Sequence, residues 1–261
     1  MPDTAPTTPP AGPPAGPART PSSDLPPAVP PRVPLVGFDL DMTLVDSREG
    51  IAATLRRTLA EVGVTVTDAD VWPWTGMPLD LILGGLVPDA APATVRVLAE
   101  RYRELYPGTG VDSVTALPGA VAALAGPHAH GGRSVVVSAK HTPNVHRVLA
   151  AAGLTAALGD GEVAGDLFAE AKGVLLGELG ATAYVGDHPG DVRAARVAGA
   201  VAVGVATGAH TARQLLAEGA DVVLADLGEF PAWLAGHATE LRGPVVPDPR
   251  DAVGRTARQS V

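Results

Sequence analysis

The sequence predicts an α/β fold, in which a Rossmann-like, three-layer core built on a parallel sheet carries an inserted α-helical cap. Short apolar runs alternate with segments of helical period along most of the chain, as in βαβ units. The alternation breaks over residues 48–114, where two long helical patterns follow one another. Only 3% of the residues are aromatic, so Ala, Val and Leu must fill the core, and such small residues let helices approach a parallel sheet closely.

Five strands and five helices are expected to alternate in the core. The strands are expected at 33–38, 133–137, 181–185, 201–205 and 221–224, and the helices at 120–125, 142–152, 168–179, 191–198 and 211–217. Thr142 and Pro143 have the residue types of an N-cap and a first helical position. Strands separated by such helices form a parallel sheet, and ligands bind beyond the carboxyl ends of its strands.

The insert between the first strand and the rest of the core is expected to be helical. Its helical patterns cover residues 51–62 and 93–106, with a Trp-Pro-Trp-Thr-Gly-Met-Pro segment between them. The predicted division is therefore a core of residues 33–47 and 115–240, a cap of residues 48–114, and two tails. The tails, residues 1–32 and 241–261, are rich in residues that disfavour a packed core, and we expect them to be flexible.

Composition excludes several classes of partner. The net charge of −9 argues against a nucleic-acid partner, which needs a basic surface. The chain has no cysteine, hence no disulfide or thiolate metal site. No apolar run approaches the roughly 20 residues of a membrane span, and the N-terminus lacks the pattern of a signal peptide. We therefore expect a cytoplasmic protein without a membrane partner.

Two acids follow the first predicted strand. Asp39 and Asp41 are two residues apart, so on an extended segment their side chains point the same way. Paired carboxylates repel each other unless a cation lies between them or one is protonated. One of them could attack phosphorus while the other moves a proton. Equally, both could be turn acids of the kind common at strand ends.

Polar residues follow two further elements in the same way. Ser138 and Ala139 come directly after the strand at 133–137, where a hydroxyl and backbone N–H groups can bind an anion. Lys172 lies at the start of a predicted helix, where a cation is unfavourable unless its ammonium meets a phosphate. Each of these residues, taken alone, is as easily an ordinary turn serine or a solvated surface lysine.

The segment Gly186-Asp187-His188-Pro189-Gly190-Asp191 follows the strand at 181–185. Asp187 is a hard oxygen donor in a position suited to Mg²⁺. Asp191 begins the next helix, where an acid is favourable in any protein. His188 is expected to face solvent.

The ordered set of these motifs is similar to that of the haloacid dehalogenase-like hydrolase superfamily. The resemblance covers roughly residues 33–230, and the insert resembles the helical cap of the phosphoglycolate phosphatase-like branch. Two positions depart from that branch: Met42 stands where Gly is usual, and Gly173 follows Lys172 where Pro is commoner. At Met42 we expect a change in local packing only.

The resemblance implies a Mg²⁺-dependent phosphatase acting on a small phosphorylated metabolite. It implies that Asp39 is the nucleophile and Asp41 the proton donor and acceptor. It further implies that Mg²⁺ is bound by Asp39, by Asp187 and by the backbone carbonyl of Asp41. Ser138, Ala139 and Lys172 would bind the phosphate. Thr43 and Asp191 would support these residues from behind. Trp72, Trp74, Gly76 and Met77 are candidates for reading the substrate, although the tryptophans suit a cap core equally well.

Several alternatives stay open at this point. A phosphoglucomutase-like enzyme would return the phosphoryl group to its substrate. A dehalogenase is disfavoured because it uses one catalytic Asp without a second carboxylate such as Asp41. A phosphorylatable receiver, or a non-catalytic module that binds a phosphorylated ligand, is disfavoured by the long insert and the complete set of acids. The particular phosphate ester and the oligomeric state cannot be predicted from this sequence.

Overall fold

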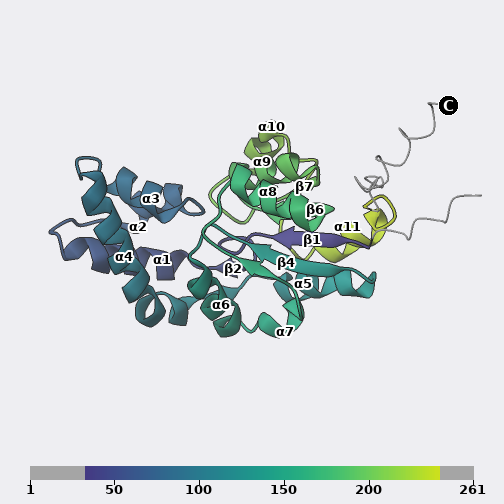
Figure 1. Cartoon of the computed structure of the whole chain (residues 1–261), viewed down its shortest axis with the longest axis horizontal. Helices are drawn as coiled ribbons and strands as arrows, with labels where there is room; N and C mark the ends of the chain where they lie inside the picture. The colour runs from purple at the N-terminus through teal and green to yellow at the C-terminus, as the bar shows by residue number, and fades with distance from the viewer. Residues whose placement is uncertain (1–32, 242–261) are drawn as a thin grey trace, which may run out of the picture. The chain divides into compact units, whose positions relative to one another are not determined.

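A six-stranded parallel sheet forms the centre of the computed structural model, which describes residues 33–241 (Figure 1). The strand order is β5-β4-β1-β6-β7-β8. The strands are β1 (Leu35–Phe38), β4 (Arg133–Val137), β5 (Val163–Ala164), β6 (Ala183–Gly186), β7 (Val201–Val205) and β8 (Val222–Leu224). The predicted α/β class is confirmed, and the five expected strands are all present, with ends shifted by at most a few residues.

Side chains along the strands alternate between two hydrophobic clusters, one on each face of the sheet. Val36 and Phe38 of β1 belong to one cluster, whereas Leu35 belongs to the other. In β4, the side chain of Val136 likewise lies on the opposite face of the sheet from that of its neighbour Val135. Both faces are covered because parallel sheets are stable only when helices bury both sides.

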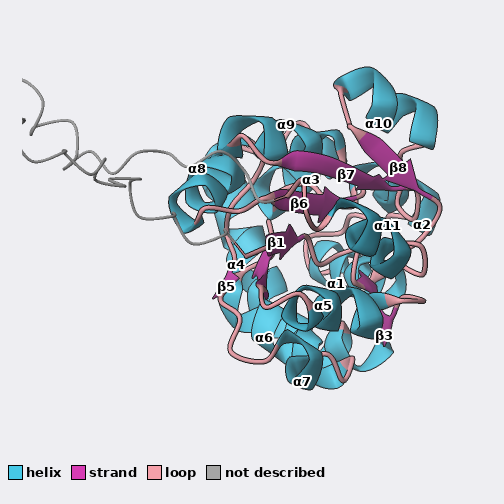
Figure 2. Ribbon diagram, turned by 90° about the vertical axis from the view of Figure 1, so that its right-hand side faces the viewer, coloured by secondary structure: helices cyan, strands magenta, loops and turns pink. Residues whose placement is uncertain are grey.

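Two layers of helices cover these faces (Figures 1 and 2). One layer contains α8 (Glu170–Leu179), α9 (Pro189–Ala198) and α10 (Ala212–Glu218). The other contains α5 (Ala120–Ala129), α6 (Thr142–Ala151), α7 (Thr155–Leu158) and α11 (Phe230–His237). The result is the predicted three-layer arrangement.

The helical insert leaves and re-enters the core through a small second sheet. Its strands, β2 (Val45–Asp46) and β3 (Thr115–Ala116), are antiparallel. Between them lie α1 (Arg48–Ala60), α2 (Asp68–Val71), η1 (Trp72–Trp74), α3 (Leu79–Leu86), α4 (Pro92–Thr109) and η2 (Val111–Ser113). These helices follow one another within the predicted insert, and we refer to residues 48–114 as the cap.

Glycine lets the first cap helix approach the end of the fourth closely. A Cβ atom on Gly50 would lie 2.2 Å from the carbonyl oxygen of Gly110, which is shorter than any contact a real side chain makes. The two ends of the cap therefore meet through backbone rather than through side chains.

Two sequence-based expectations for the core are corrected by the structure. Strand β5 was not predicted, because two residues carry too little periodicity to be recognised. Thr142 is not the N-cap of α6; His141 holds that position. The Thr142 hydroxyl instead accepts a hydrogen bond of 3.0 Å from the N–H of Gly165, so it ties α6 to the segment that follows β5.

Among the described helices, none is both long and apolar enough to cross a membrane. The two tails predicted at 1–32 and 241–261 lie almost entirely outside the described residues.

Candidate active site

The carboxyl ends of neighbouring strands bring together residues that are far apart in the sequence. Asp39 follows β1, Ser138 follows β4, and Asp187 follows β6. The N–H of Asp39 donates to the carbonyl of Val185 at 2.9 Å, which holds the first acid against the end of β6. The register of a parallel sheet thus forms the site, because its strands end at a common edge.

Lys172 forms the centre of a buried ionic network. Its Nζ lies 2.9 Å from Oδ1 of Asp39 and 2.7 Å from Oδ1 of Asp191, and only 1% of the residue is exposed. Burial disfavours its charged form, but Asp191 and Asp39 raise the pKa of Lys172 well above its ordinary value. The inward direction expected for this ammonium is therefore observed, and its two partners in the structure are carboxylates.

Burial dominates the electrostatics of Asp39. It raises the pKa of this carboxyl from 3.8 to about 7; Lys172 opposes that rise, while Asp191 and Asp41 add to it. Ionisation of Asp39 is thus costly until a further positive charge arrives.

Three carboxylates lie close enough to share a cation. One oxygen each from Asp39, Asp187 and Asp191 lies within 4.8 Å of the others, and all three residues are buried. The Thr43 hydroxyl donates to Oδ1 of Asp187 at 3.0 Å and fixes that carboxylate. Burial, followed by the charges of Asp191 and Asp39, raises the pKa of Asp187 well above its ordinary value.

This donor set suits a divalent metal ion. If all three carboxylates were ionised as metal ligands, the single ammonium of Lys172 would leave two negative charges for a cation to compensate. Oxygen donors of this kind are the ligands that Mg²⁺ prefers. Sequence reasoning treated Asp191 as a supporting residue, but the structure brings its carboxylate as close as the other two.

Asp41 lies in a separate pairing that the sequence did not reveal. Its Oδ2 is 3.1 Å from Nζ of Lys140, which also lies 4.3 Å from the centre of the Tyr106 ring. Burial disfavours the charged form of Lys140, but Asp41 and Tyr106 raise its pKa above the ordinary value. The other oxygen of Asp41 is buried without a hydrogen-bond partner among the described residues, and so has an acceptor position available. The ion pair joins residues 99 positions apart, so no local signal could have identified it.

Met42, which follows Asp41 and precedes Thr43, has a left-handed backbone with φ of 61°. Its N–H donates to Val45 at 2.8 Å, and its carbonyl accepts from the Thr207 hydroxyl at 2.6 Å. These bonds hold a conformation that costs a non-glycine residue about 1 kcal/mol. The expectation of a packing change alone is therefore wrong, because the side chain also imposes a backbone cost.

The loop after β4 lies at the floor of the site. Ser138 is 1% exposed, and its Oγ accepts from the N–H of Lys140 at 3.3 Å. Ser138 and Ala139 both line the cavity that Asp39 and Asp41 also line. The structure therefore brings the expected phosphate-binding loop to the expected acids.

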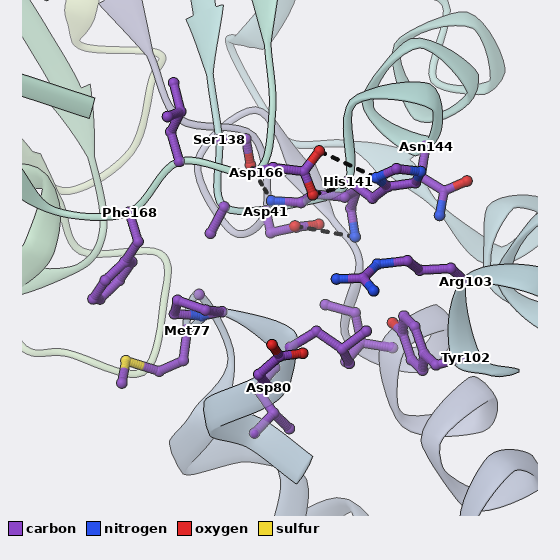
Figure 3. Close-up of a pocket in the computed structure, with 18 of the residues that line it drawn as sticks. Asp41, Met77, Asp80, Tyr102, Arg103, Ser138, His141, Asn144, Asp166 and Phe168 are labelled. Carbon is purple, nitrogen blue, oxygen red and sulfur yellow. Dashed lines mark hydrogen bonds and ion pairs between the residues drawn. The ribbon is translucent and has the colours of Figure 1, made fainter. Parts of the chain in front are cut away.

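That cavity has a volume of about 260 Å³, and residues of the cap form its other side (Figure 3). Gly76 and Met77, two of the four candidate reading residues, line it. A Cβ atom on Gly76 would lie 3.5 Å from the ring of His188, so this cap loop reaches the core loop after β6. Residues that the sequence did not suggest also line it, among them Tyr102, Arg103 and His141.

Trp72 and Trp74 do not line this cavity, which corrects their assignment as reading residues. Trp74 packs against the hydrophobic core, and its ring fills the space where Gly85 has no side chain. Trp72 stacks under the guanidinium of Arg48, 5.5 Å from the ring centre. Both therefore belong to the structure of the cap.

His188 is buried rather than facing solvent, contrary to expectation. Its Nδ1 accepts from the N–H of Gly190 at 2.9 Å and caps α9. Its ring packs edge-on against His210, with 4.6 Å between centres. Burial lowers the pKa of His188 to about 4, so the ring is neutral at physiological pH.

Family comparisons agree with this geometry. The sequence model of the haloacid dehalogenase-like hydrolase family matches residues 36–196, and a second, HAD-hydrolase-like, model matches residues 163–230. The chain therefore belongs to the haloacid dehalogenase-like hydrolase family, and it is an enzyme of the phosphatase type within it.

Individual relatives are similar over most of their length. A protein of Dickeya dadantii named "Probable phosphatase IndB" is 32% identical over 221 residues, covering 78% of this chain and 94% of the relative. The phosphoglycolate phosphatase of Yersinia pestis is 30% identical over 209 residues, which cover 75% of this chain and 90% of the relative. One similar solved structure is the crystal structure of a HAD family hydrolase from Deinococcus radiodurans with bound phosphate and sodium. It superposes on this chain with a TM-score of 0.57 at 25% identity, and the match covers 82% of this chain and 99% of that one.

Proposed function

We propose that the protein is a Mg²⁺-dependent phosphatase that hydrolyses a small phosphate monoester through an aspartyl-phosphate on Asp39. The observation that carries the proposal is the buried contact of Asp39 with Lys172, beside Asp41 in one small cavity. A carboxylate held by a cation and facing a cavity can act as a nucleophile. A second carboxyl group in the same cavity can move the proton that the reaction requires.

In the first step, a carboxylate oxygen of Asp39 attacks phosphorus. The new O–P bond forms as the bond between phosphorus and the substrate's alcohol oxygen breaks. Asp41 transfers a proton to that oxygen, so the alcohol leaves neutral. The free Oδ1 of Asp41 and the Lys140 contact on its Oδ2 favour this role, because one oxygen is held in place while the other can hydrogen-bond to the substrate.

In the second step, water attacks the phosphorus of the aspartyl-phosphate. Asp41, now ionised, accepts a proton from the water as the O–P bond to Asp39 breaks. Inorganic phosphate and the starting form of both acids result, so protons balance over the cycle. One group serving as acid and then as base is expected of a double displacement.

Asp39, Asp187 and the backbone carbonyl of Asp41 would hold the Mg²⁺, and the proximity of Asp191 supports adding its carboxylate, directly or through water. The ion would supply positive charge to the phosphoryl oxygens. Ser138, the Ala139 N–H and Lys172 would bind those same oxygens. Thr43 orients Asp187 through its hydrogen bond.

The cavity and the relatives both favour a small substrate. About 260 Å³ lies below the usual 300–1,000 Å³ of sites for drug-sized ligands. Some relatives are named phosphoglycolate phosphatase, and a phosphorylated two- or three-carbon metabolite has the size that this cavity accepts. Gly76 and Met77 would contact its organic part.

Phosphate release from p-nitrophenyl phosphate with Mg²⁺ tests the proposal. Asp39→Asn retains the shape of the side chain and removes the nucleophile, so activity should fall by at least about 10³-fold. Asp160→Asn, at an exposed acid outside the cavity, should retain wild-type activity. Near wild-type hydrolysis by Asp39→Asn would exclude the mechanism.

A further inference from the structure

We propose that Arg103 determines specificity by binding a carboxylate on the alcohol half of the substrate. The inference rests on the proposed function, since it assigns the part of the substrate that remains after the phosphoryl group is bound. The substrate class would then be phosphate monoesters of small hydroxy acids.

Arg103 reaches the cavity from the cap. It lies on α4, is partly buried and lines the cavity together with Asp39, Asp41 and Ser138. Figure 3 shows its guanidinium directed into the cavity, between Asp41 on the core side and Asp80 on the cap side. The side chain is therefore positioned to contact a bound substrate on the side away from the core.

The other basic side chains that line the cavity already have acidic partners. Lys140 lies 3.1 Å from Asp41, and Nδ1 of His141 lies 3.1 Å from Asp166. Within residues 33–241, Arg103 has no ion pair and donates no hydrogen bond to a side chain or carbonyl. A partly buried guanidinium with five unused donors is costly unless a ligand or water satisfies them.

A neighbouring arginine on the same helix differs in this respect. Arg101, two residues away and hence on another face of α4, makes ion pairs with Glu61 at 2.8 Å and Glu104 at 3.0 Å. The paired arginine thus lies away from the cavity, and the unpaired one faces it. This contrast favours a ligand for Arg103 over a general role in stabilising the helix.

Charge and size favour a carboxylate as the partner. A planar guanidinium binds a carboxylate through two parallel hydrogen bonds. A second phosphate would bring about two negative charges, and one guanidinium cannot compensate them with Asp80 and Asp41 on either side. The small cavity also leaves room for only a few atoms between the phosphoryl and carboxylate groups.

The test measures binding in a background that cannot turn over. Calorimetric titration of Asp39→Asn with Mg²⁺ compares 2-phosphoglycolate with ethyl phosphate, which has a methyl group where the first has a carboxylate. We expect 2-phosphoglycolate to bind about 10- to 100-fold more tightly, the worth of one charge-assisted pair. Adding Arg103→Met should remove most of this difference and leave the Kd of ethyl phosphate within about threefold.

Two control variants separate a direct contact from a distant effect of charge. Arg103→Lys keeps the charge but loses the planar fork, so it should retain part of the preference. Arg96→Met removes an exposed positive charge two turns earlier on α4, outside the cavity. This variant should retain the full preference for 2-phosphoglycolate over ethyl phosphate.

The inference is overturned if Asp39→Asn binds both ligands equally, or if the preference survives Arg103→Met. An equal loss of affinity for both ligands in the Arg103→Met variant would also overturn it, since that result indicates a structural role for Arg103. Failure of the proposed function is detected separately, by the absence of Mg²⁺-dependent phosphate release from p-nitrophenyl phosphate by the wild-type enzyme.

Discussion

Replacing the buried Asp39 by Asn should make the metal-free protein more stable at neutral pH. Burial raises the pKa of this carboxyl from 3.8 to about 7 in the folded state. A group whose pKa is raised by folding contributes its stability fully below the unfolded pKa, and that stability is lost as the pH rises through the folded pKa. The loss should therefore develop between pH about 4 and pH about 7.

The size of the effect follows from the shift. Each unit of pKa difference corresponds to about 1.36 kcal/mol, so Asp39 should cost the protein about 4 kcal/mol across this window. An amide of the same shape has no charge to bury, so the Asp39→Asn variant would escape this cost. Lys172 keeps its 2.7 Å contact with Asp191 in the variant, so the network is not left with an unpaired cation.

Urea unfolding at a series of pH values in the presence of a chelator measures this difference. The free energies of unfolding of wild type and Asp39→Asn should be similar near pH 4 and diverge as the pH rises, with the variant more stable at pH 7.5. Added Mg²⁺ should stabilise the wild type by about 2.7 kcal/mol at 100 times its Kd, and the variant less. Parallel pH profiles for the two proteins without metal would refute the reasoning.

Three further predictions concern single side chains around the site. Asp187→Ala removes a buried metal donor, so the Mg²⁺ concentration for half-maximal activity should rise by at least about 10-fold; an unchanged Mg²⁺ titration would contradict the metal assignment. Lys140→Met leaves Asp41 without its partner at 3.1 Å, and kcat for p-nitrophenyl phosphate should fall by about 10- to 100-fold; a wild-type kcat would show that this pair has no catalytic importance. Ala169→Gly should raise the free energy of unfolding by about 1 kcal/mol, because Ala169 has φ of 46° and ψ of −117°. Ala171→Gly, at an exposed position in the same helix, is the matched control and should lower it by a similar amount.

Much of the core could be predicted because its signals are local. Apolar runs such as 133–137 have the length and composition of buried strands, and the polar residues directly after them indicate which edge of the sheet binds a ligand. Asp39, Ser138 and Asp187 were identified in this way, and Lys172 by its unfavourable place at a helix start; the structure brings these residues to one region. Strand β5 was missed since its two residues pair only because β4 already lies beside them.

Pairings between distant residues could not be predicted. The contact of Asp41 with Lys140 depends on the way in which the loop after β4 turns toward β1. The burial of His188 depends on the positions of Phe168 and His210, which pack against its ring. Neither residue carries a pattern that distinguishes it from a surface lysine or a loop histidine.

The chain's order of residues was sufficient to predict the class of fold and the edge of the sheet that carries the site, and to place the paired carboxylates Asp39 and Asp41 at that edge. Those features follow from periodicity and from the geometry of parallel strands, which are properties of short segments. Tertiary structure alone decided that the Asp191 carboxylate lies beside those of Asp39 and Asp187, that Lys140 pairs with Asp41, and that Arg103 rather than a tryptophan of the cap lines the cavity. The physical reason is that charge compensation and cavity lining depend on distances between segments, and those distances are set only when the cap and the sheet pack together.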